Sequence, residues 1–410
     1  MANHSTARSG VEAKYCEVIR IWRENRCLRE SSIAVYLRWI ESFREYCRNR
    51  GLEETTQLTA AGISKFAETY AKARAISAKT AVSGAHSALR TWAQALIMLG
   101  HELPRWEAPP PAKPPLSPLL EAFVEHIRQH RGNAPATITK KIRHSRDFLA
   151  FLRRRRRCLT QVRLEDIDAF VVACRHRYAR TVVADICSSV RTLLRFLHAT
   201  GRLSADLAPA VIAPVVRQHE RPLRSLPWDA VQRILQAVDR TTARGRRDYA
   251  LLLLMSTYGL GAGEVIRLTL DDIDWRAATV HIVRPKTGAE VLLPLLPAIA
   301  RALVVYLRRG RPAHALTRHL FVQMRAPYAP LSASSAVRHR LVKHARAAGV
   351  SSPYLGSHVL RHSHARRQLE LGTPAKVIGD ILGHRDAEST SAYVRVATER
   401  LRPLALPVPR

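Results

Sequence analysis

Two proline-rich stretches limit how this chain can fold, because no helix of ordinary length can run through either of them. The first lies between Pro104 and Pro118 and contains Pro109-Pro110-Pro111 and Pro114-Pro115, which predict a stiff, extended linker. The second covers about residues 205–227, where four prolines interrupt any helix. A chain of 410 residues is also too long for a single hydrophobic core. The sequence therefore predicts three segments, at residues 11–104, 116–204 and 222–410.

The first two segments resemble two copies of one helical unit. In the first segment apolar residues recur at helical spacing, at Ile33, Leu37, Ile40, Phe43 and Cys47. All of them except Ile40 have an apolar counterpart 105 positions later, at Ile138, Ile142, Phe148 and Leu152. Two more matches follow in the same order, Ile63 and Phe66 with Ile167 and Phe170, then Arg90-Thr91 and Gly100 with Arg191-Thr192 and Gly201. The order favours a duplication. The alternative is that any two amphipathic bundles look alike at this level of detail.

The third segment mixes helices with a small sheet. Helical periodicity covers residues 228–238 and 248–257, and residues 279–283 and 291–295 predict two strands joined through Pro285-Lys286-Thr287-Gly288. Thr373 and Pro374 predict a helix start with a capping hydroxyl and a proline in the first turn, and Gly383 predicts its end. A last helix is expected over residues 388–401. The predicted fold is mainly α, with tandem helical domains followed by a mostly helical α+β domain that holds a small antiparallel sheet.

The charge of the chain points to a polyanionic partner. Its 66 Lys and Arg residues against 33 acidic residues give a formal net charge of +33. Such an excess disfavours folding through self-repulsion, so nucleic acid is the leading candidate and a plain solvated surface the alternative. No membrane partner is expected: residues 1–5 lead into no apolar segment, and the longest apolar run, residues 250–255, is far shorter than the roughly 20 residues that span a bilayer. We therefore expect a soluble, cytoplasmic protein.

The cysteines predict neither disulfides nor a metal site. All six lie in the first half of the chain, none forms a C-x-x-C pair, and none has a His at zinc-ligand spacing. We expect reduced, buried or half-buried thiols and no bound metal.

The last 130 residues carry a set of side chains suited to breaking a phosphodiester without a metal. That reaction needs a nucleophile, cationic donors around the non-bridging oxygens and an acid for the leaving oxygen. His358 and Arg361 are three residues apart at a helix start, Lys286 lies at a hairpin tip, and Tyr393 follows His384 by nine residues.

These stretches resemble the signature of the tyrosine recombinases (the phage integrase family). His358-Val359-Leu360-Arg361-His362 is similar to the family's H-x-L-R-H, and Leu382-Gly383-His384 to its L-G-H, with Tyr393 at the family's spacing. Tyr258-Gly259-Leu260 with Glu264 resembles the G-L-R-x-x-E-L motif, and the turn around Lys286 resembles the hairpin that bears the family's lysine. The matches cover the third segment in order, and the set is far more specific than any one motif.

The resemblance implies a role for each matching residue. Tyr393 would attack the scissile phosphate and form a 3′-phosphotyrosyl link; Arg361 would clamp the non-bridging oxygens. His358 would hydrogen-bond the phosphate or accept the tyrosine proton, His384 would donate a further hydrogen bond, and Lys286 would protonate the leaving oxygen. The resemblance also implies helical DNA-binding domains ahead of the catalytic domain, double-stranded DNA as substrate and no cofactor. It implies a homo-tetramer or a hetero-assembly with other recombinases, and association with a bacterial nucleoid. Taken singly, Tyr393 could be an ordinary half-buried tyrosine, His384 a helix cap and Lys286 a surface lysine. His362 and His364 are expected to be structural or surface residues.

Five consecutive arginines, Arg153, Arg154, Arg155, Arg156 and Arg157, end a predicted helix of the second segment. Consecutive residues point all around a helix axis, so the run cannot form one stripe. We expect some of these guanidinium groups to contact DNA phosphates and the rest to be solvated.

The chain departs from the family at one position. An arginine should follow Gly259-Leu260, but Gly261 stands there. Losing one fixed donor to a developing charge typically costs about 10²–10³ in rate. Either another cation (Arg246, Arg247 or Arg267) reaches the phosphate, or the site is impaired. The alternatives to an active recombinase are therefore a DNA-binding accessory subunit and, more distantly, a type IB topoisomerase-like nicking enzyme.

Overall fold

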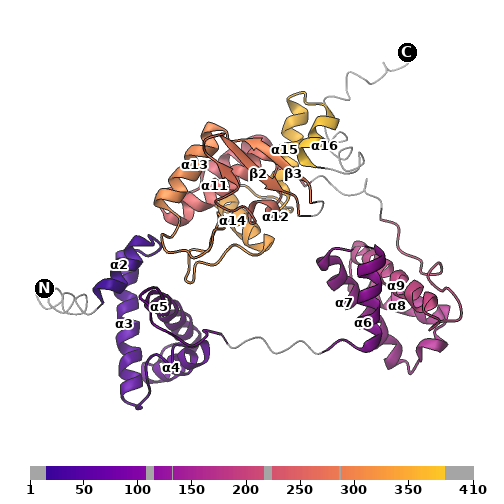
Figure 1. The fold of residues 1–410 in the computed structure, drawn as a ribbon, viewed down its shortest axis with the longest axis horizontal. Helices are drawn as coiled ribbons and strands as arrows, with labels where there is room; N and C mark the ends of the chain where they lie inside the picture. The colour runs from indigo at the N-terminus through magenta and orange to yellow at the C-terminus, as the bar shows by residue number, and fades with distance from the viewer. Residues whose placement is uncertain (1–14, 108–114, 132, 217–223, 286–287, 384–410) are drawn as a thin grey trace, which may run out of the picture. The chain divides into compact units, whose positions relative to one another are not determined.

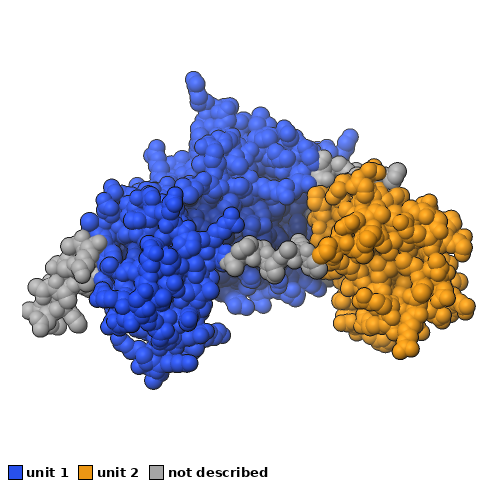
Figure 2. Space-filling view, turned by 60° about the horizontal axis from the view of Figure 1, so that its bottom comes forward, with its two compact units in different colours: residues 1–109, 223–410 blue, residues 110–222 orange. Residues whose placement is uncertain are grey.

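The computed structural model describes residues 15–107, 115–131, 133–216, 224–285 and 288–383 (Figure 1). Contacts divide the chain into two compact units, coloured separately in Figure 2. Residues 1–109 and 223–410 form one unit, and residues 110–222 form the other. The three predicted segments each contain a hydrophobic core of their own. The division of the chain into three domains remains a prediction.

The unit of residues 110–222 is a bundle of helices. Its elements are α6 (Pro118–Arg131), α7 (Pro135–Arg154), the short 3₁₀ helix η1 (Leu159–Gln161), α8 (Leu164–Arg177) and α9 (Arg180–Ala199). Helix α9 packs against α6, α7 and α8 and buries ten of its side chains. A proline begins α7, where its missing N–H has no helical partner to lose.

Residues 16–98 contain four helices in the same order. They are α2 (Cys16–Glu24), α3 (Glu30–Arg48), α4 (Ala60–Ala73) and α5 (Ala78–Met98). The matched residues Phe43 and Phe148 are both fully buried, in α3 and α7. Gly100 and Gly201 follow α5 and α9 by two residues, and both have positive φ angles, +89° and +68°. The helical correspondence that the sequence predicts is thus present in the order of the helices, their buried positions and the turn after the last one.

The C-terminal segment is an α+β structure, as the sequence predicts. Its helices are α10 (Trp228–Gln236), α11 (Ala243–Tyr258), α12 (Ala262–Val265), α13 (Pro297–Arg309), α14 (Ser334–Ala347), α15 (Val359–Glu370) and α16 (Ala375–Leu382). Strands β1 (Ile273–Asp274), β2 (Thr279–Val283) and β3 (Glu290–Pro294) form an antiparallel sheet in that order. In its register Val280 pairs with Ile273 on one side and Leu293 on the other.

Helix α11 is the centre of this segment, and its far end leads into the candidate site. It packs against α10, α13 and α15 and is buried on most of its surface, as expected for a core helix. It begins five residues before the predicted boundary because the Thr242 hydroxyl accepts a hydrogen bond from the Gly245 N–H and caps it. At its other end Tyr258 donates to the carbonyl of Pro294 at 2.5 Å, which ties α11 to β3.

Two further local predictions need correction. The Thr373 hydroxyl does not cap α16, because it donates to the Gln368 side chain at 2.8 Å, and Pro374 stands at the N-cap, just before the first turn. The sequence also missed strand β1, whose two residues are too few to show a pattern.

The N-terminal helices contact the C-terminal segment through the turn after α2. Asn25, almost fully buried, accepts a hydrogen bond from the backbone N–H of His314 at 3.0 Å. The His314 ring lies 2.7 Å from the Glu24 carboxylate, and the Cys27 thiol lies 3.7 Å from the sulfur of Met324. These contacts account for the grouping of both segments in one unit.

The thiols do not all follow expectation. Cys47, Cys174 and Cys187 are buried, but Cys16 and Cys158 are exposed, which corrects the prediction that all six would be buried or half-buried. Within the described ranges, no helix is both long and apolar enough to cross a membrane.

Candidate functional site

Helix α15 brings two of the predicted catalytic residues together. His358 occupies its N-cap position and Arg361 lies in its first turn, so both side chains are held at the start of one helix. The helix is anchored by a small core with α16 formed by Ala365, Leu369, Ile378 and Leu382. His358 is exposed and Arg361 is half-buried.

Arg361 reaches three neighbouring elements. Its Nη1 donates to the carbonyl of Gly259 at 3.1 Å and lies 3.4 Å from Oε2 of Glu264, and its Nη2 donates to the carbonyl of Leu382. The guanidinium therefore links the end of α11, the short helix α12 and the carboxyl end of α16.

Gly261 lies in the middle of this group. Glu264 Oε2 accepts the Gly261 N–H at 2.7 Å, so the carboxylate caps α12. A Cβ placed on Gly261 would lie 3.6 Å from Glu264 Oε2 and 3.8 Å from Cε1 of His358, which are ordinary van der Waals distances. The backbone there has φ −73° and ψ 152°, a conformation open to any L-residue. Neither the backbone nor the available space requires a glycine.

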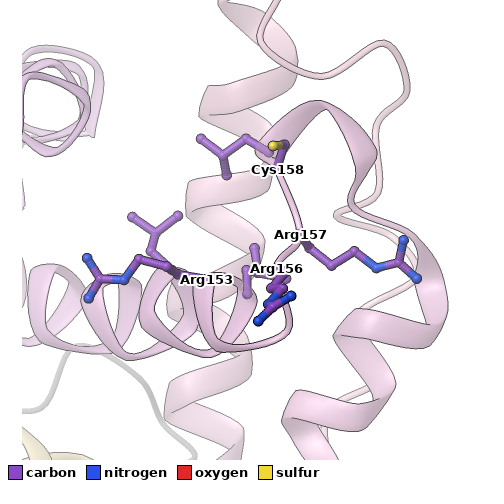
Figure 3. Close-up of a pocket in the computed structure, with 7 residues that line it drawn as sticks. Arg153, Arg156, Arg157 and Cys158 are labelled. Atoms are coloured by element: carbon purple, nitrogen blue, oxygen red, sulfur yellow. The ribbon is translucent and has the colours of Figure 1, made fainter.

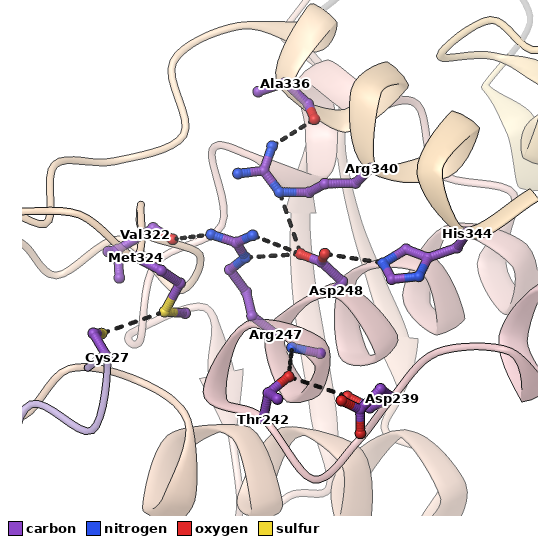
Figure 4. A network of polar contacts seen from close by, with 11 residues as sticks. Cys27, Asp239, Thr242, Arg247, Asp248, Val322, Met324, Ala336, Arg340 and His344 are labelled. Atoms are coloured by element: carbon purple, nitrogen blue, oxygen red, sulfur yellow. Dashed lines mark hydrogen bonds and ion pairs between the residues drawn. The ribbon is translucent and has the colours of Figure 1, made fainter. Parts of the chain in front are cut away.

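Two of the three cations considered as substitutes for the missing arginine have other partners. Arg246 donates to the carbonyl of Arg309 at 2.7 Å, and Arg267 is exposed. Arg247 is buried against Asp248, with Nη2 at 2.6 Å from Oδ1 (Figure 4). The guanidinium groups of Arg246 and Arg247 are thus committed to other partners.

The cluster around Asp248 joins α11 to α14. Its Oδ1 also lies 3.2 Å from Nε of Arg340, and its Oδ2 lies 3.0 Å from Nε2 of His344 (Figure 4). Burial raises the pKa of Asp248, but the hydrogen bond to His344 and the charges of Arg247 and Arg340 outweigh it, so the net pKa is lowered. Burial and the nearby charge of Arg247 lower the pKa of Arg340 to about 10. This cluster holds one carboxylate among several cations and is a structural element of the segment.

Arg284 is a member of the site that the sequence reasoning missed. Only 4% exposed, it donates from Nη1 to Glu264 Oε1 at 3.1 Å and to the carbonyl of Leu382 at 2.7 Å. Its Nη2 donates to the carbonyl of Ile381 at 2.5 Å. A signal existed: Val280 and Ile282 of β2 face inward, so residue 284 continues the inward alternation of that strand.

The carboxyl end of α16 completes the group. Gly383 ends the helix in the left-handed conformation, with φ +65°, as its position in the sequence predicts. The Glu264 carboxylate lies between Arg284 and Arg361, and both guanidinium groups donate to the carbonyl of Leu382. These three side chains carry a formal net charge of +1, and cationic donors of this kind suit the stabilisation of a phosphate.

Lys286, His384 and Tyr393 lie outside the described residues. The last predicted helix, residues 388–401, lies outside them as well.

The two further histidines of the motif differ in environment. His364 is buried, and its Nδ1 lies 3.1 Å from the carbonyl of Ser256, at the end of α11. Burial lowers its pKa and so disfavours the charged ring, and the buried position agrees with the expectation that His364 is structural. The His362 ring is half-buried, with its centroid 6.5 Å from that of His358. Across the described part of the chain, no group of three or more His, Cys, Asp or Glu side chains is arranged to hold a metal ion.

The arginines of the run in the second segment have different surroundings. Helix α7 ends at Arg154, and Nη1 of Arg155 and Nε of Arg157 lie 3.9 and 3.6 Å from the buried carboxylate of Asp166. Arg153 and Arg156 instead border a cavity of about 380 Å³ together with Arg157 and Cys158 (Figure 3). At least two of the five arginines therefore have a structural partner.

Two regions of the chain match models of the same protein family. Residues 224–400 match the model of the phage integrase family, and residues 120–201 match that of the phage integrase N-terminal SAM-like domain. The chain is 35% identical over 299 residues to the putative integrase/recombinase y4rA of Sinorhizobium fredii, covering 71% of this chain and 70% of that protein. It is 27% identical over 284 residues to the tyrosine recombinase XerD of Vibrio vulnificus, covering 69% of this chain and 92% of that protein.

Solved structures show the same fold. A lambda integrase dimer bound to a COC′ core site matches with a TM-score of 0.53 and 18% identity, over 68% of this chain and 94% of that one. The Tn1549 transposon integrase in complex with a circular intermediate DNA matches with a TM-score of 0.52 and 17% identity, over 69% and 99% of the two chains.

Proposed function

Because this chain belongs to the phage integrase family of tyrosine recombinases, we propose that it is a site-specific DNA recombinase that cleaves and rejoins DNA through a 3′-phosphotyrosyl intermediate. The observation that carries the proposal is the meeting of Arg361 and His358 beside Gly261 and Glu264, residues that come from separate motifs of the sequence. Tyr393, the proposed nucleophile, falls within the matched residues 224–400.

The proposed reaction assigns one step to each residue. The hydroxyl oxygen of Tyr393 attacks the scissile phosphorus, and the bond from phosphorus to the 5′-oxygen breaks. Arg361 stabilises the charge on the non-bridging oxygens by a bidentate contact, which lysine cannot make. His358 accepts the tyrosine proton or donates to the phosphate, His384 adds a hydrogen bond, and Lys286 gives the leaving oxygen its proton. The covalent link keeps the phosphoester bond available for rejoining, so the reaction needs no cofactor.

The substrate in this proposal is double-stranded DNA. A formal net charge of +33 favours a phosphate backbone as partner. Solved relatives include a lambda integrase tetramer bound to a Holliday junction, and we propose a comparable tetramer, or a hetero-assembly with other recombinases, for this chain. Residues 11–104 and 116–204 would act as DNA-binding domains and residues 222–410 as the catalytic domain, on DNA of a bacterial nucleoid.

A nicked suicide substrate tests the proposal directly. Footprinting on DNA that flanks the gene identifies the site, and a duplex with a nick beside the cleavage position then traps the covalent protein–DNA adduct. The wild-type protein should form an adduct that Tyr393→Phe does not form, while both bind the DNA with similar affinity. A Tyr393→Phe protein that still forms adduct would reject Tyr393 as nucleophile.

Gly261 favours a second candidate, an accessory DNA-binding subunit that works beside a competent recombinase. The position holds no guanidinium although its backbone conformation and the space around it accept a Cβ atom. If the wild-type protein binds its site but forms no adduct, and Gly261→Arg does form one, the accessory role replaces the active one. A flat dependence of DNA affinity on salt would count against both candidates.

A further inference from the structure

We infer that Arg284 is a positioning residue of the cleavage site, which holds the carboxyl end of α16 and keeps Glu264 from neutralising Arg361. Helix α16 leads directly into Gly383 and His384, and Tyr393 follows nine residues later. The inference rests on the proposed function, because it assigns Arg284 a role in the same reaction.

The contacts of Arg284 are those that the end of a helix needs. The last four carbonyls of a helix have no partner within it, and they carry the negative end of the helix dipole. Arg284 donates to two of these carbonyls, those of Ile381 and Leu382, at 2.5 and 2.7 Å. Helix α16 has only eight residues, too few to be stable alone. Contacts with other elements therefore hold its carboxyl end in position.

The packing around Gly383 shows how closely Arg284 fits. A Cβ on Gly383 would lie 2.4 Å from Nε and 2.6 Å from Cδ of Arg284, closer than any real contact. Glycine is therefore required at residue 383 for two reasons, the φ of +65° and the space that the arginine fills. The side chain of Arg284 and the end of α16 form one packed joint.

The charge balance gives Arg284 its second effect. Glu264 Oε1 lies 3.1 Å from Arg284 and Oε2 lies 3.4 Å from Arg361. With both arginines present, the three groups keep a formal charge of +1. Without Arg284, Glu264 and Arg361 form a neutral pair, and an incoming phosphate meets no net positive charge from them. Arg284 thus supplies charge that the missing arginine at residue 261 does not.

Three variants separate this role from a general loss of structure. Arg284→Gln removes the charge and most of the contacts, whereas Arg284→Lys keeps the charge but cannot reach two carbonyls and a carboxylate in one plane. Arg311→Gln is the matched control, because Arg311 also donates from Nη2 to two backbone carbonyls, those of Thr317 and His319, in a different part of the segment.

Two measurements are made on the full-length proteins: the rate of adduct formation on the suicide DNA, and hydrogen–deuterium exchange of peptides covering α16. We expect Arg284→Gln to slow adduct formation roughly 10- to 100-fold, since a misplacement of about 1 Å can cost 10²-fold. DNA affinity should stay within about threefold, and α16 amides should exchange about tenfold faster. Arg284→Lys should have an intermediate rate with fast α16 exchange, and Arg311→Gln should match the wild type in both.

The two measurements distinguish a failure of this inference from a failure of the proposed function. Unchanged α16 exchange in Arg284→Gln overturns the inference, and so does an unchanged cleavage rate. If the wild-type protein forms no adduct, the proposed function fails, and the exchange data still decide whether Arg284 holds α16.

A double-mutant cycle provides the sharpest check of the joint. Gly383→Ala should lose activity partly because its Cβ collides with Cδ and Nε of Arg284. Since Arg284→Ala removes both atoms, the double variant should lose less activity than the product of the two separate losses. Strictly multiplicative losses would mean that the two residues act independently, against the inference.

Discussion

Restoring an arginine at residue 261 should raise the cleavage rate of this protein without unfolding it. A Cβ there meets its nearest neighbours at 3.6–3.8 Å, and the backbone has φ −73° and ψ 152°, so the substitution needs no movement of the main chain. Replacing a glycine at a compatible position typically stabilises by about 0.4–1 kcal/mol, which offsets part of the cost of desolvating the new charge. We expect the free energy of unfolding to change by no more than about 1–2 kcal/mol.

The gain in rate follows from the charge around Glu264. One preorganised donor is typically worth about 10²–10³ in rate. Glu264 Oε2 already lies 3.4 Å from Arg361 and accepts the residue 261 N–H at 2.7 Å, so a new guanidinium would divide its contacts between this carboxylate and the phosphate. We therefore expect a gain below that range, about 10- to 100-fold over wild type.

The assay is the single-turnover rate of adduct formation on the suicide DNA, with urea unfolding as the check on stability. Gly263→Arg is the matched control, because a Cβ there would meet only Pro285 Cγ at 3.9 Å and the same charge is added two residues away from the motif position. A folded Gly261→Arg protein that binds DNA and cleaves no faster than Gly263→Arg would refute the reasoning.

Three other regions give predictions. Asp248→Asn should lower the free energy of unfolding by about 3–5 kcal/mol, measured by urea denaturation, because buried cations lose their counter-charge. Since the pKa of Asp248 is lowered in the folded protein, its contribution to stability should be complete above the unfolded pKa and disappear as pH falls through the lower folded value, which unfolding curves between pH 5 and 2 would show. Arg156→Gln should reduce the slope of log DNA affinity against log salt concentration by about one and leave the free energy of unfolding unchanged. Arg157→Gln leaves the buried Asp166 carboxylate with one cation fewer and should lower the free energy of unfolding. Equal free energies of unfolding in the two variants would contradict this. Exposed Cys158 should react rapidly with a thiol reagent at pH 8, while burial, which raises the pKa of Cys27 to about 12, should make Cys27 slow.

Patterns that depend on neighbouring residues could be predicted from the sequence. The proline-rich stretches, the recurrence of buried positions such as Phe43 and Phe148, and the turn at Gly383 all follow from local rules of periodicity and backbone conformation. The fold class and the family motifs were accessible for the same reason, since His358 and Arg361 are fixed relative to each other by one turn of helix. The boundaries of helices were harder to predict. The Arg-rich first turns of α11 have no apolar pattern, and the Thr242 cap fixes the residue at which the helix begins.

The sequence by itself determined the classes of the secondary-structure elements and the fold class, and it named the candidate catalytic residues. Only the tertiary structure decided which cations gather around Glu264: it directed Arg246 and Arg247 to other partners and brought in Arg284 from strand β2. The reason is physical. A guanidinium acts through distances of about 3 Å, and a linear pattern does not state which of many arginines, dozens of residues apart, will have its charge buried beside a given carboxylate.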